Sequence, residues 1–512
     1  MHKSFLKIGS AIEGFPQYSL VSIVFLVSIV ALIPAWMNYD IIARDGAHLY
    51  VPVATLFLEG RFHEALFGPL RPLFPLPLYE FLIFVVAKIS GLPPEISGRL
   101  VSAGSFVLGS VGIFRVSELL LKNREMALLS VLFYLSNKQL LSNSVDCLKE
   151  AMFVCIIIWG NFFVLRAIVS QQKKGFYYSL GGILLLSGAM VRSTSVVFLG
   201  AWLAIWVFHK REGFALRLMV LLVPFITFFA MSYLMPEFPL FRRSFSLKTY
   251  LFFLTQSYKS LLEVGNASVQ LIFQFLGISQ YLMTLFGIVG MYHLGKTPYT
   301  KHLVIVFVIF FVLCIGMGWN YSGLNSDRFI LAPSLWLIPA SSYEIARSIQ
   351  SRRSTIKCLA ILTVVALPFF WANKAFDPPD QDRLARKEAG LWILAQVGPH
   401  KDVITNRERI AFYAQGNIIT LVNNPSLDKL GAEIAQRYPE GTSIILSDIM
   451  DKKSLKKAMV LDTLLDDGKF WKAFLDNLGI KPNKAFRSIY VYLPQRVLKI
   501  SNSASSLSLQ GG

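Results

Sequence analysis

Residues 18–50 read YSLVSIVFLVSIVALIPAWMNYDIIARDGAHLY. The first part, 18–37, carries no charged side chain, and about 20 apolar residues suffice to cross the hydrocarbon core of a bilayer as an α-helix. Charged and polar side chains follow directly, among them Asp45 and His48. No small-residue cleavage site follows the apolar run, so this pattern predicts an uncleaved first membrane span that leads into a polar loop.

Similar apolar runs recur along the chain. Of its 512 residues, 54% are hydrophobic and only 16% are charged, whereas soluble domains average about 25% charged residues. We therefore predict a polytopic α-helical membrane protein of about 11 transmembrane helices. The predicted spans are 18–37, 100–121, 126–141, 146–168, 176–191, 195–208, 214–235, 270–293, 303–319, 329–346 and 357–373.

One further apolar stretch, 73–90, decides the topology. Three prolines at its start (Pro72, Pro75 and Pro77) leave only about 13 residues for a helix, which is too short to span. We interpret it as an interfacial helix on the outer face, because five short basic loops can then all be cytoplasmic, as the positive-inside rule requires. These loops are 122–124, 173–174, 210–211, 296–301 and 347–357. The alternative has twelve spans with every later loop inverted.

The domain organisation follows from this topology. Residues 1–373 form a membrane module with two long outer loops, 38–99 and 236–269. From Asp377 the composition changes to that of a soluble domain, and we predict a small α/β domain over 374–500 and a disordered tail over 501–512. Within that domain we predict strands at 402–405, 418–422, 443–446 and 488–493, and helices at 386–396 and 407–413.

The net charge of +19 does not predict a nucleic-acid partner, because the basic residues lie mostly in the short loops and the tail. Topology and anionic membrane lipids explain them better. The cysteines lack metal-ligand spacing and fall in or beside apolar runs, which is typical of small core residues. They are Cys147, Cys155, Cys314 and Cys358.

Charged residues from distant parts of the chain share the predicted outer ends of the spans. An arginine at the outer surface requires an anion, either a carboxylate or a lipid phosphate, although a single arginine can also snorkel to the headgroups. Arg115 and Glu118, near an inner end, are interpreted as a structural pair. The outer set is Arg44, Asp45, His48, Arg71, Asp146, Lys149, Arg192, Arg242, Arg243, Asp327 and Arg328.

Two carboxylates in this set suit catalysis. Asp45 follows the first span by a few residues and can accept a proton from a hydroxyl or amine that attacks an activated sugar. Asp146 opens the fourth predicted span and would face the same cavity. For Asp146 the alternative is an aspartate that stabilises a helix N-terminus.

In their order along the chain, several segments resemble the C-type glycosyltransferase (GT-C) fold, in its protein O-mannosyltransferase and aminoarabinose-transferase-like branch. That branch uses polyprenyl-phosphate sugar donors. The likeness covers most of the chain, and no single segment is specific. The segments are Asp45 to Tyr50, Leu58-Glu59-Gly60, Arg71 to Tyr79, Arg99-Leu100, Asp146, Asp327 to Pro333, Glu388 to Ile393, Val403 to Thr405 and Ala411 to Ala414.

The resemblance implies roles for particular residues. Asp45 would be the catalytic base, Asp146 would position donor or acceptor, and His48, Tyr50, Arg71 and Arg192 would also bind substrate. Arg242, Arg243 and Arg328 would hold the lipid phosphate. The family often has two adjacent acids in the first outer loop, but the second position here is Gly46. We therefore expect no metal ligands, and a divalent metal cofactor stays open.

The predicted function is transfer of a sugar from a polyprenyl-phosphate carrier to a lipid, glycan or protein acceptor on the non-cytoplasmic face, with inversion expected from the family. The expected location is a bacterial inner membrane with the C-terminal domain in the periplasm, where it would cap the site or bind acceptor. A glycan polymerase or ligase is the nearest alternative. A transporter or flippase is disfavoured, because the sequence shows neither repeated halves nor midplane charges.

Overall fold

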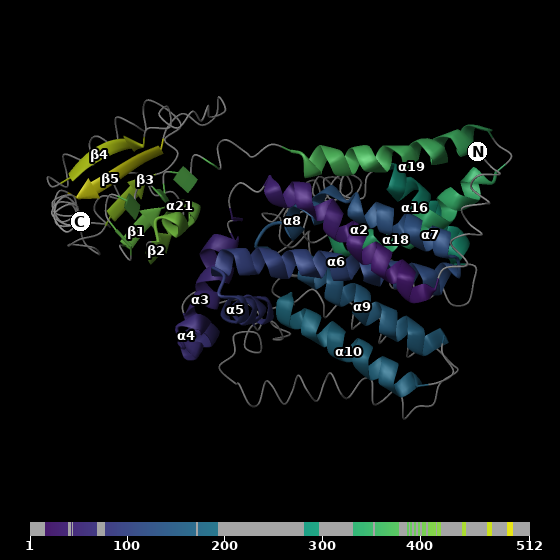
Figure 1. Cartoon of the computed structure of the whole chain (residues 1–512), viewed down its shortest axis with the longest axis horizontal. Coiled ribbons are helices and arrows are strands. Elements are labelled where there is room, and N and C mark those ends of the chain that lie inside the picture. Colours follow the sequence, from purple (N-terminus) through teal and green to yellow (C-terminus); the bar gives the residue numbers. More distant parts are fainter. Residues whose placement is uncertain are drawn as a thin grey trace, which may run out of the picture. The chain divides into compact units, whose positions relative to one another are not determined.

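Figure 1 shows the computed structural model of the chain. The described residues are 16–38, 42–43, 45–68, 77–169, 173–192, 281–295, 331–351, 354–377, 384, 387–388, 390–391, 394–395, 398–399, 402–405, 408–415, 417–420, 443–446, 468–473 and 489–494. The chain forms two compact units. One comprises Met1–Met37 and Val53–Asp377, and the other comprises Asn38–Pro52 and Pro378–Gly512.

The first unit, which we call the membrane unit, is helical in its described residues. Its helices are α2 (Gln17–Met37), α4 (Phe62–Phe67), α5 (Leu78–Ser90), α6 (Pro94–Leu121), α7 (Arg124–Leu135), α8 (Lys138–Ser144), α9 (Glu150–Val169), α10 (Lys174–Val191), α16 (Tyr281–Leu294), α18 (Leu331–Ile349) and α19 (Ser354–Ala375). Helix α3 (Val51–Leu58) crosses from one unit into the other.

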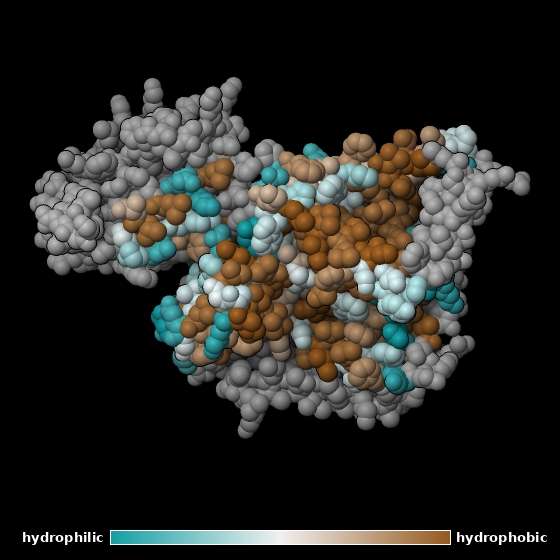
Figure 2. Space-filling model, viewed as in Figure 1, coloured by the Kyte–Doolittle hydropathy of each residue, from teal (hydrophilic) through white to brown (hydrophobic). Residues whose placement is uncertain are grey.

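Within the described ranges, four helices are long and apolar enough to cross a membrane: Tyr18–Met37, Pro94–Leu121, Glu150–Val169 and Ser354–Ala375. Large apolar side chains stand exposed on α2 and α19, for example Val30 at 63% and Phe369 at 71%. Figure 2 shows a broad hydrophobic face over this unit. Such a surface would be unfavourable in water and suits contact with lipid. The chain is an integral membrane protein.

Several predicted spans coincide with helices, and one differs. The prediction of one continuous helix over 126–141 is wrong, because α7 ends at Leu135 and α8 begins at Lys138. The side chain of Asn137 accepts a hydrogen bond from the backbone N–H of Leu140 and so caps the second helix. The spans predicted at 195–208, 214–235 and 303–319 lie outside the described residues.

Helix α5 has the length predicted for the stretch 73–90. It comprises 13 residues, begins directly after Pro77 and ends at Gly91, whose left-handed φ of 71° terminates the helix. Tyr79 and Ile83 on one face are fully buried, whereas Ile89 is 82% exposed. Helix α5 is thus too short to span a bilayer and buries one of its faces.

Helices α9 and α10 lie side by side as an antiparallel hairpin (Figure 1). Glycines permit the close approach, because a Cβ atom at Gly181 would lie 2.9 Å from the carbonyl oxygen of Gly160. Helix α6 contacts α9, α7, α5 and α2. A buried hydrogen bond between Ser28 and Ser110 (2.6 Å) joins α2 to α6.

The second unit contains a five-stranded sheet with strand order β2-β1-β3-β5-β4. The strands are β1 (Asp402–Thr405), β2 (Asn417–Thr420), β3 (Ser443–Leu446), β4 (Gly468–Ala473) and β5 (Ile489–Pro494). Strands β2, β1 and β3 are parallel, while β5 is antiparallel to β3 and β4. Helix α21 (Glu408–Tyr413) connects β1 to β2 and contacts both strands.

The same unit includes residues 38–52, which follow the first span. Within them Gly46–Tyr50 form a π-helix, labelled η1, that continues directly into α3. Helix α21 contacts η1. A segment of the first loop and a helix more than 350 residues later therefore belong to one compact unit.

Candidate active site

The residues predicted to carry catalysis in the first loop lie in and beside the π-helix. Asp45 is its N-terminal flanking residue, half-buried, with helical backbone angles (φ −64°, ψ −34°). Short π-helices are rare and occur frequently at functional sites, because the wider turn redirects side chains. Asp45 and His48 are both half-buried here, whereas Tyr50 is only 2% exposed and lies in the core.

His48 contributes an incompletely satisfied polar group. Its Nδ1 atom is buried and has no hydrogen-bond partner among the residues that the structure describes. A buried nitrogen without a partner costs free energy, so such an atom marks a position where a ligand or water would be favoured. Asp45 and His48 are three residues apart, which brings a carboxylate and an imidazole into one short segment.

The backbone that leads into this segment is held by helix α21, which belongs to the same unit. The N–H of Ile42 donates a hydrogen bond to the hydroxyl oxygen of Tyr413, at 3.1 Å. Ile42 is fully buried and Tyr413 is 8% exposed. The N–H of Ala47 then donates to the carbonyl oxygen of Ala43, which starts the helical turn around Asp45.

Asp146, the second predicted carboxylate, lies in a tight turn over residues 145–149 that precedes α9. One of its own carboxylate oxygens accepts a hydrogen bond from the backbone N–H of Cys147 at 2.7 Å. Its carbonyl oxygen accepts from the N–H of Leu148 at 2.9 Å. The turn therefore fixes the side chain of Asp146 before any ligand is considered.

Helix α6 holds this turn in place. Arg99 Nε donates to the carbonyl oxygen of Val145 at 2.9 Å. The hydroxyl of Ser102 donates to the carbonyl oxygen of Leu148 at 2.8 Å. A second nitrogen of Arg99 donates to the carbonyl oxygen of Trp36 at 3.0 Å, and its guanidinium lies 3.9 Å from the Trp36 ring centroid. Arg99 thereby ties the end of α2 to the Asp146 turn.

Arg192, predicted to bind substrate, pairs with an acid that the sequence analysis did not select. Its Nη1 atom lies 3.7 Å from Glu150 Oε1, and the two side chains are 12% and 2% exposed. Glu150 is in the first turn of α9, where its negative charge is favoured by the positive partial charge of the helix N-terminus. Arg192 directly follows α10, where its positive charge is favoured by the negative partial charge of the helix C-terminus. The structure brings Arg192 and Glu150 together at the end of the hairpin that holds the Asp146 turn.

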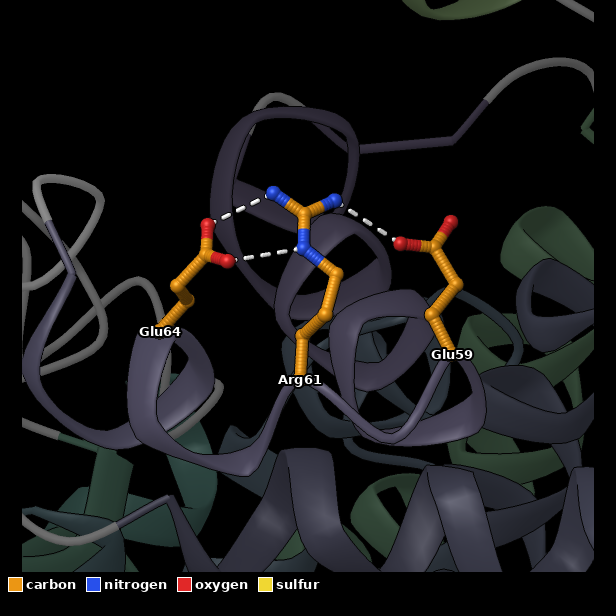
Figure 3. A network of polar contacts seen from close by, with 3 residues as sticks. All are labelled: Glu59, Arg61 and Glu64. Carbon is orange, nitrogen blue, oxygen red and sulfur yellow. Dashed lines mark hydrogen bonds and ion pairs between the residues drawn. The ribbon is translucent and has the colours of Figure 1, made fainter.

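A third polar cluster lies on the surface, between α3 and α4. Arg61 donates to both carboxylate oxygens of Glu64, at 2.9 and 2.6 Å, and to Glu59 at 2.9 Å (Figure 3). These hydrogen bonds raise the pKa of Arg61, and the bonds from Arg61 lower the pKa of Glu64. All three side chains are about half exposed. The cluster closes the turn at Gly60, whose φ of 75° favours glycine.

Four predicted site residues lie outside the described residues: Arg71, Arg242, Arg243 and Arg328. Among the described positions, no group of three or more His, Cys, Asp or Glu side chains gathers in the way a metal ion needs. The predicted pair Arg115–Glu118 is present, with Nη1 and Oε2 2.9 Å apart, and Glu118 also bonds Arg124.

Residues 71–236 match the family model described as dolichyl-phosphate-mannose-protein mannosyltransferase. This range contains the Asp146 turn and Arg192, and it begins after Asp45, which it therefore does not include. No curated protein sequence matches the chain. The whole chain superposes on ArnT from Cupriavidus metallidurans in the apo state, with a TM-score of 0.58 at 12% identity, covering 94% of this chain and 99% of that one.

Over residues 71–236 the chain thus matches a family of membrane glycosyltransferases, and along 94% of its length it has the ArnT fold. ArnT from the same organism bound to undecaprenyl phosphate is similar to this chain at a TM-score of 0.57, with 12% identity over 93% of this chain and 98% of that one. The Archaeoglobus fulgidus oligosaccharyltransferase in complex with zinc and sulfate gives 0.55, with 11% identity over 93% and 76%. The predicted resemblance to glycosyltransferases that use polyprenyl-phosphate sugar donors is confirmed.

Three residues that contact candidate site residues or hold their backbone were missed or given no role: Glu150, Tyr413 and Arg99. Glu150 had a signal, because it follows Asp146 by one helical turn, directly after Lys149 at the start of an apolar run. Arg99 and Tyr413 were noted only as parts of the family resemblance. Their hydrogen-bond partners lie far away in sequence, so no local pattern reveals them.

Proposed function

We propose that this glycosyltransferase moves a sugar from a polyprenyl-phosphate carrier to a hydroxyl or amine of a lipid, glycan or protein acceptor, on the non-cytoplasmic face of a bacterial inner membrane. Asp45 is the general base. The observation that carries the proposal is the half-buried Asp45 at the start of a π-helix, beside a histidine whose buried Nδ1 has no partner in the described residues. The five basic loops support the assignment of the face.

The proposed reaction is a single displacement. The acceptor oxygen or nitrogen attacks the anomeric carbon and gives its proton to the Asp45 carboxylate. The bond between the anomeric carbon and the phosphate oxygen breaks, and polyprenyl phosphate leaves with that electron pair. Attack opposite to the leaving group inverts the anomeric configuration. Cationic side chains stabilise the negative charge that develops on the phosphate, and Arg71, Arg242, Arg243 and Arg328 are the proposed group.

Asp146 has a positioning role in this proposal. Its turn is held by Arg99 and Ser102 on α6, so its carboxylate has a fixed place to orient the acceptor or the sugar. The C-terminal unit is proposed to lie on the same side of the membrane as Asp45, because residues 38–52 fold with it.

The test uses purified protein in nanodiscs with a panel of polyprenyl-phosphate sugars and a crude envelope lipid and glycan fraction as acceptor. We expect release of polyprenyl phosphate from at least one donor and a product with inverted anomeric configuration. Consumption of no donor contradicts the proposal. Movement of the donor across the bilayer without cleavage would instead support the flippase alternative.

A further inference from the structure

The segment that carries Asp45 is built as part of the C-terminal unit. Residues 38–52 and 378–512 form one compact unit, although the first membrane span immediately precedes the former. Helix α21 contacts the π-helix. The C-terminal unit thus includes the backbone of Asp45 itself, which a domain that only covered the site would not require.

One hydrogen bond joins the two parts of this unit close to Asp45. The N–H of Ile42, three residues before Asp45, donates to the Tyr413 hydroxyl at 3.1 Å, and both residues are buried. The following residue, Ala43, supplies the carbonyl oxygen that accepts from the N–H of Ala47. The turn around Asp45 therefore starts one residue after the backbone N–H that Tyr413 binds.

The Tyr413 side chain is itself held. The Phe412 ring meets it edge to face, with the ring centroids 5.1 Å apart. The backbone of Gly390 comes so close that a Cβ atom there would lie 2.7 Å from Tyr413 Cβ. A phenol fixed by its neighbours can hold a flexible loop in one position, because little of its own freedom remains to be lost.

We propose that Tyr413 is a positioning residue for the transfer reaction, acting through the Ile42 backbone to hold the carboxylate of Asp45 in line with the acceptor. The proposal rests on the proposed function of Asp45. Loss of the hydroxyl alone would leave the aromatic ring in place and release the loop. A misplacement on the order of 1 Å can reduce a rate about 100-fold, so one lost hydrogen bond has a measurable effect.

The test compares Tyr413→Phe with wild type and with Lys387→Met. The control removes the charge over the same ring and keeps the hydroxyl. In Tyr413→Phe we expect kcat to fall by about 10- to 100-fold, with the KM for donor within about threefold of wild type. We expect Lys387→Met to keep the wild-type kcat, and both variants to keep the thermal midpoint of wild type.

Hydrogen exchange supplies a readout that needs no turnover. We expect the amides of residues 42–50 to exchange at least about tenfold faster in Tyr413→Phe, because the buried bond no longer protects them, and at the wild-type rate in Lys387→Met. Unchanged exchange, an unchanged kcat, or equal losses in both variants overturns the proposal. A wild-type protein that consumes no donor contradicts the proposed function, and the exchange rates still decide whether Tyr413 holds the segment.

Discussion

At the scale of single residues, the clearest long-range pair is Arg192 with Glu150. Both side chains are largely buried and their charged atoms are 3.7 Å apart. Breaking a buried ion pair by removing one partner costs about 3–5 kcal/mol, because the remaining charge loses its compensation.

We expect Arg192→Met to lower the thermal midpoint in detergent markedly, and the double variant Arg192→Met with Glu150→Gln to recover most of that loss. The coupling between the two substitutions, measured as a double-mutant cycle, is the decisive quantity. If the losses of stability in the two single variants simply add in the double variant, Arg192 and Glu150 do not stabilise each other. A raised KM for donor in Arg192→Met without lost stability would instead support the substrate-binding role that the sequence predicted.

The Glu59–Arg61–Glu64 cluster predicts a local dependence on pH. The pKa of Glu64 is lowered below its ordinary value of about 4.3, so its stabilising contribution is present above that value and is lost as the pH falls through the lowered pKa. Hydrogen exchange of residues 59–65, corrected for intrinsic rates, should therefore quicken as the pH falls below about 4.3 and through the lowered pKa of Glu64. The variant Glu64→Gln should exchange as fast already at pH 7. Equal protection of both proteins at pH 7 would show that the cluster does not hold this turn.

The glycine at position 46 leads to a prediction about metals. Divalent cations such as magnesium and calcium prefer several carboxylate oxygens, and this position supplies none next to Asp45. We expect sugar transfer to stay within about twofold after treatment with EDTA, because the proposed charge stabilisation comes from arginines. Loss of activity that manganese, magnesium or zinc restores would instead establish a metal-dependent site.

The sequence suggested Asp45, His48 and Asp146 as candidates because each lies near an apolar run, where an ionisable residue is conspicuous. It did not reveal Tyr413, whose neighbours in sequence resemble those of any helix in a soluble domain. The partner of its hydroxyl, Ile42, lies 371 positions away. Such a pairing depends on how the chain folds, and one sequence contains no signal for it.

At the scale of elements, the Asp146 turn is fitted closely against α6. A Cβ atom at Gly98 would overlap the sulfur of Cys147, and the carbonyl oxygen of Gly98 accepts a hydrogen bond from the Tyr79 hydroxyl at 3.1 Å. Tyr79 Oη also lies 3.7 Å from the same sulfur. Helices α5 and α6 and the turn thus meet at one buried point with no spare volume.

We expect Gly98→Ala to displace the turn, to destabilise the protein by about 1–3 kcal/mol and to reduce sugar transfer. Adding Cys147→Ala removes the sulfur and should restore both stability and rate toward wild type. Thermal unfolding and transfer rates of the two single variants and the double variant test this. If Cys147→Ala gives no recovery, the overlap does not control the position of the turn.

Element boundaries were predictable where one physical signal dominated. Prolines set the start of α5, and Gly91 ends it. The break between α7 and α8 was missed, although four consecutive polar residues, Ser136 to Gln139, interrupt the apolar run at this point. Strand β4 (Gly468–Ala473) was also missed, since its sequence GKFWKA is too polar and too short to signal a strand. Pairing with β5 along its whole length stabilises it.

At the scale of the whole molecule, composition predicted the membrane class, which is confirmed. The interfacial position of α5, which we predicted from loop charge and parity, stays a prediction. A boundary near residue 373 was predictable from the change in composition, but the assignment of residues 38–52 to the C-terminal unit was not. The predicted boundary at residue 373 leaves the whole first loop in the membrane module, whereas residues 38–52 form a unit with the C-terminal residues. Discontinuous units arise from contacts that periodicity and composition do not encode.

The central claim is that Asp45 is the base of a sugar transfer from a polyprenyl-phosphate donor. The measurement that tests it most directly is the turnover of purified Asp45→Asn beside wild type, with donor binding measured on the same preparations. Asparagine keeps the shape of aspartate but cannot accept the acceptor proton, so we predict a fall in kcat of about 100- to 10,000-fold with donor affinity within about threefold of wild type. A folded Asp45→Asn protein that transfers sugar at the wild-type rate would contradict the claim.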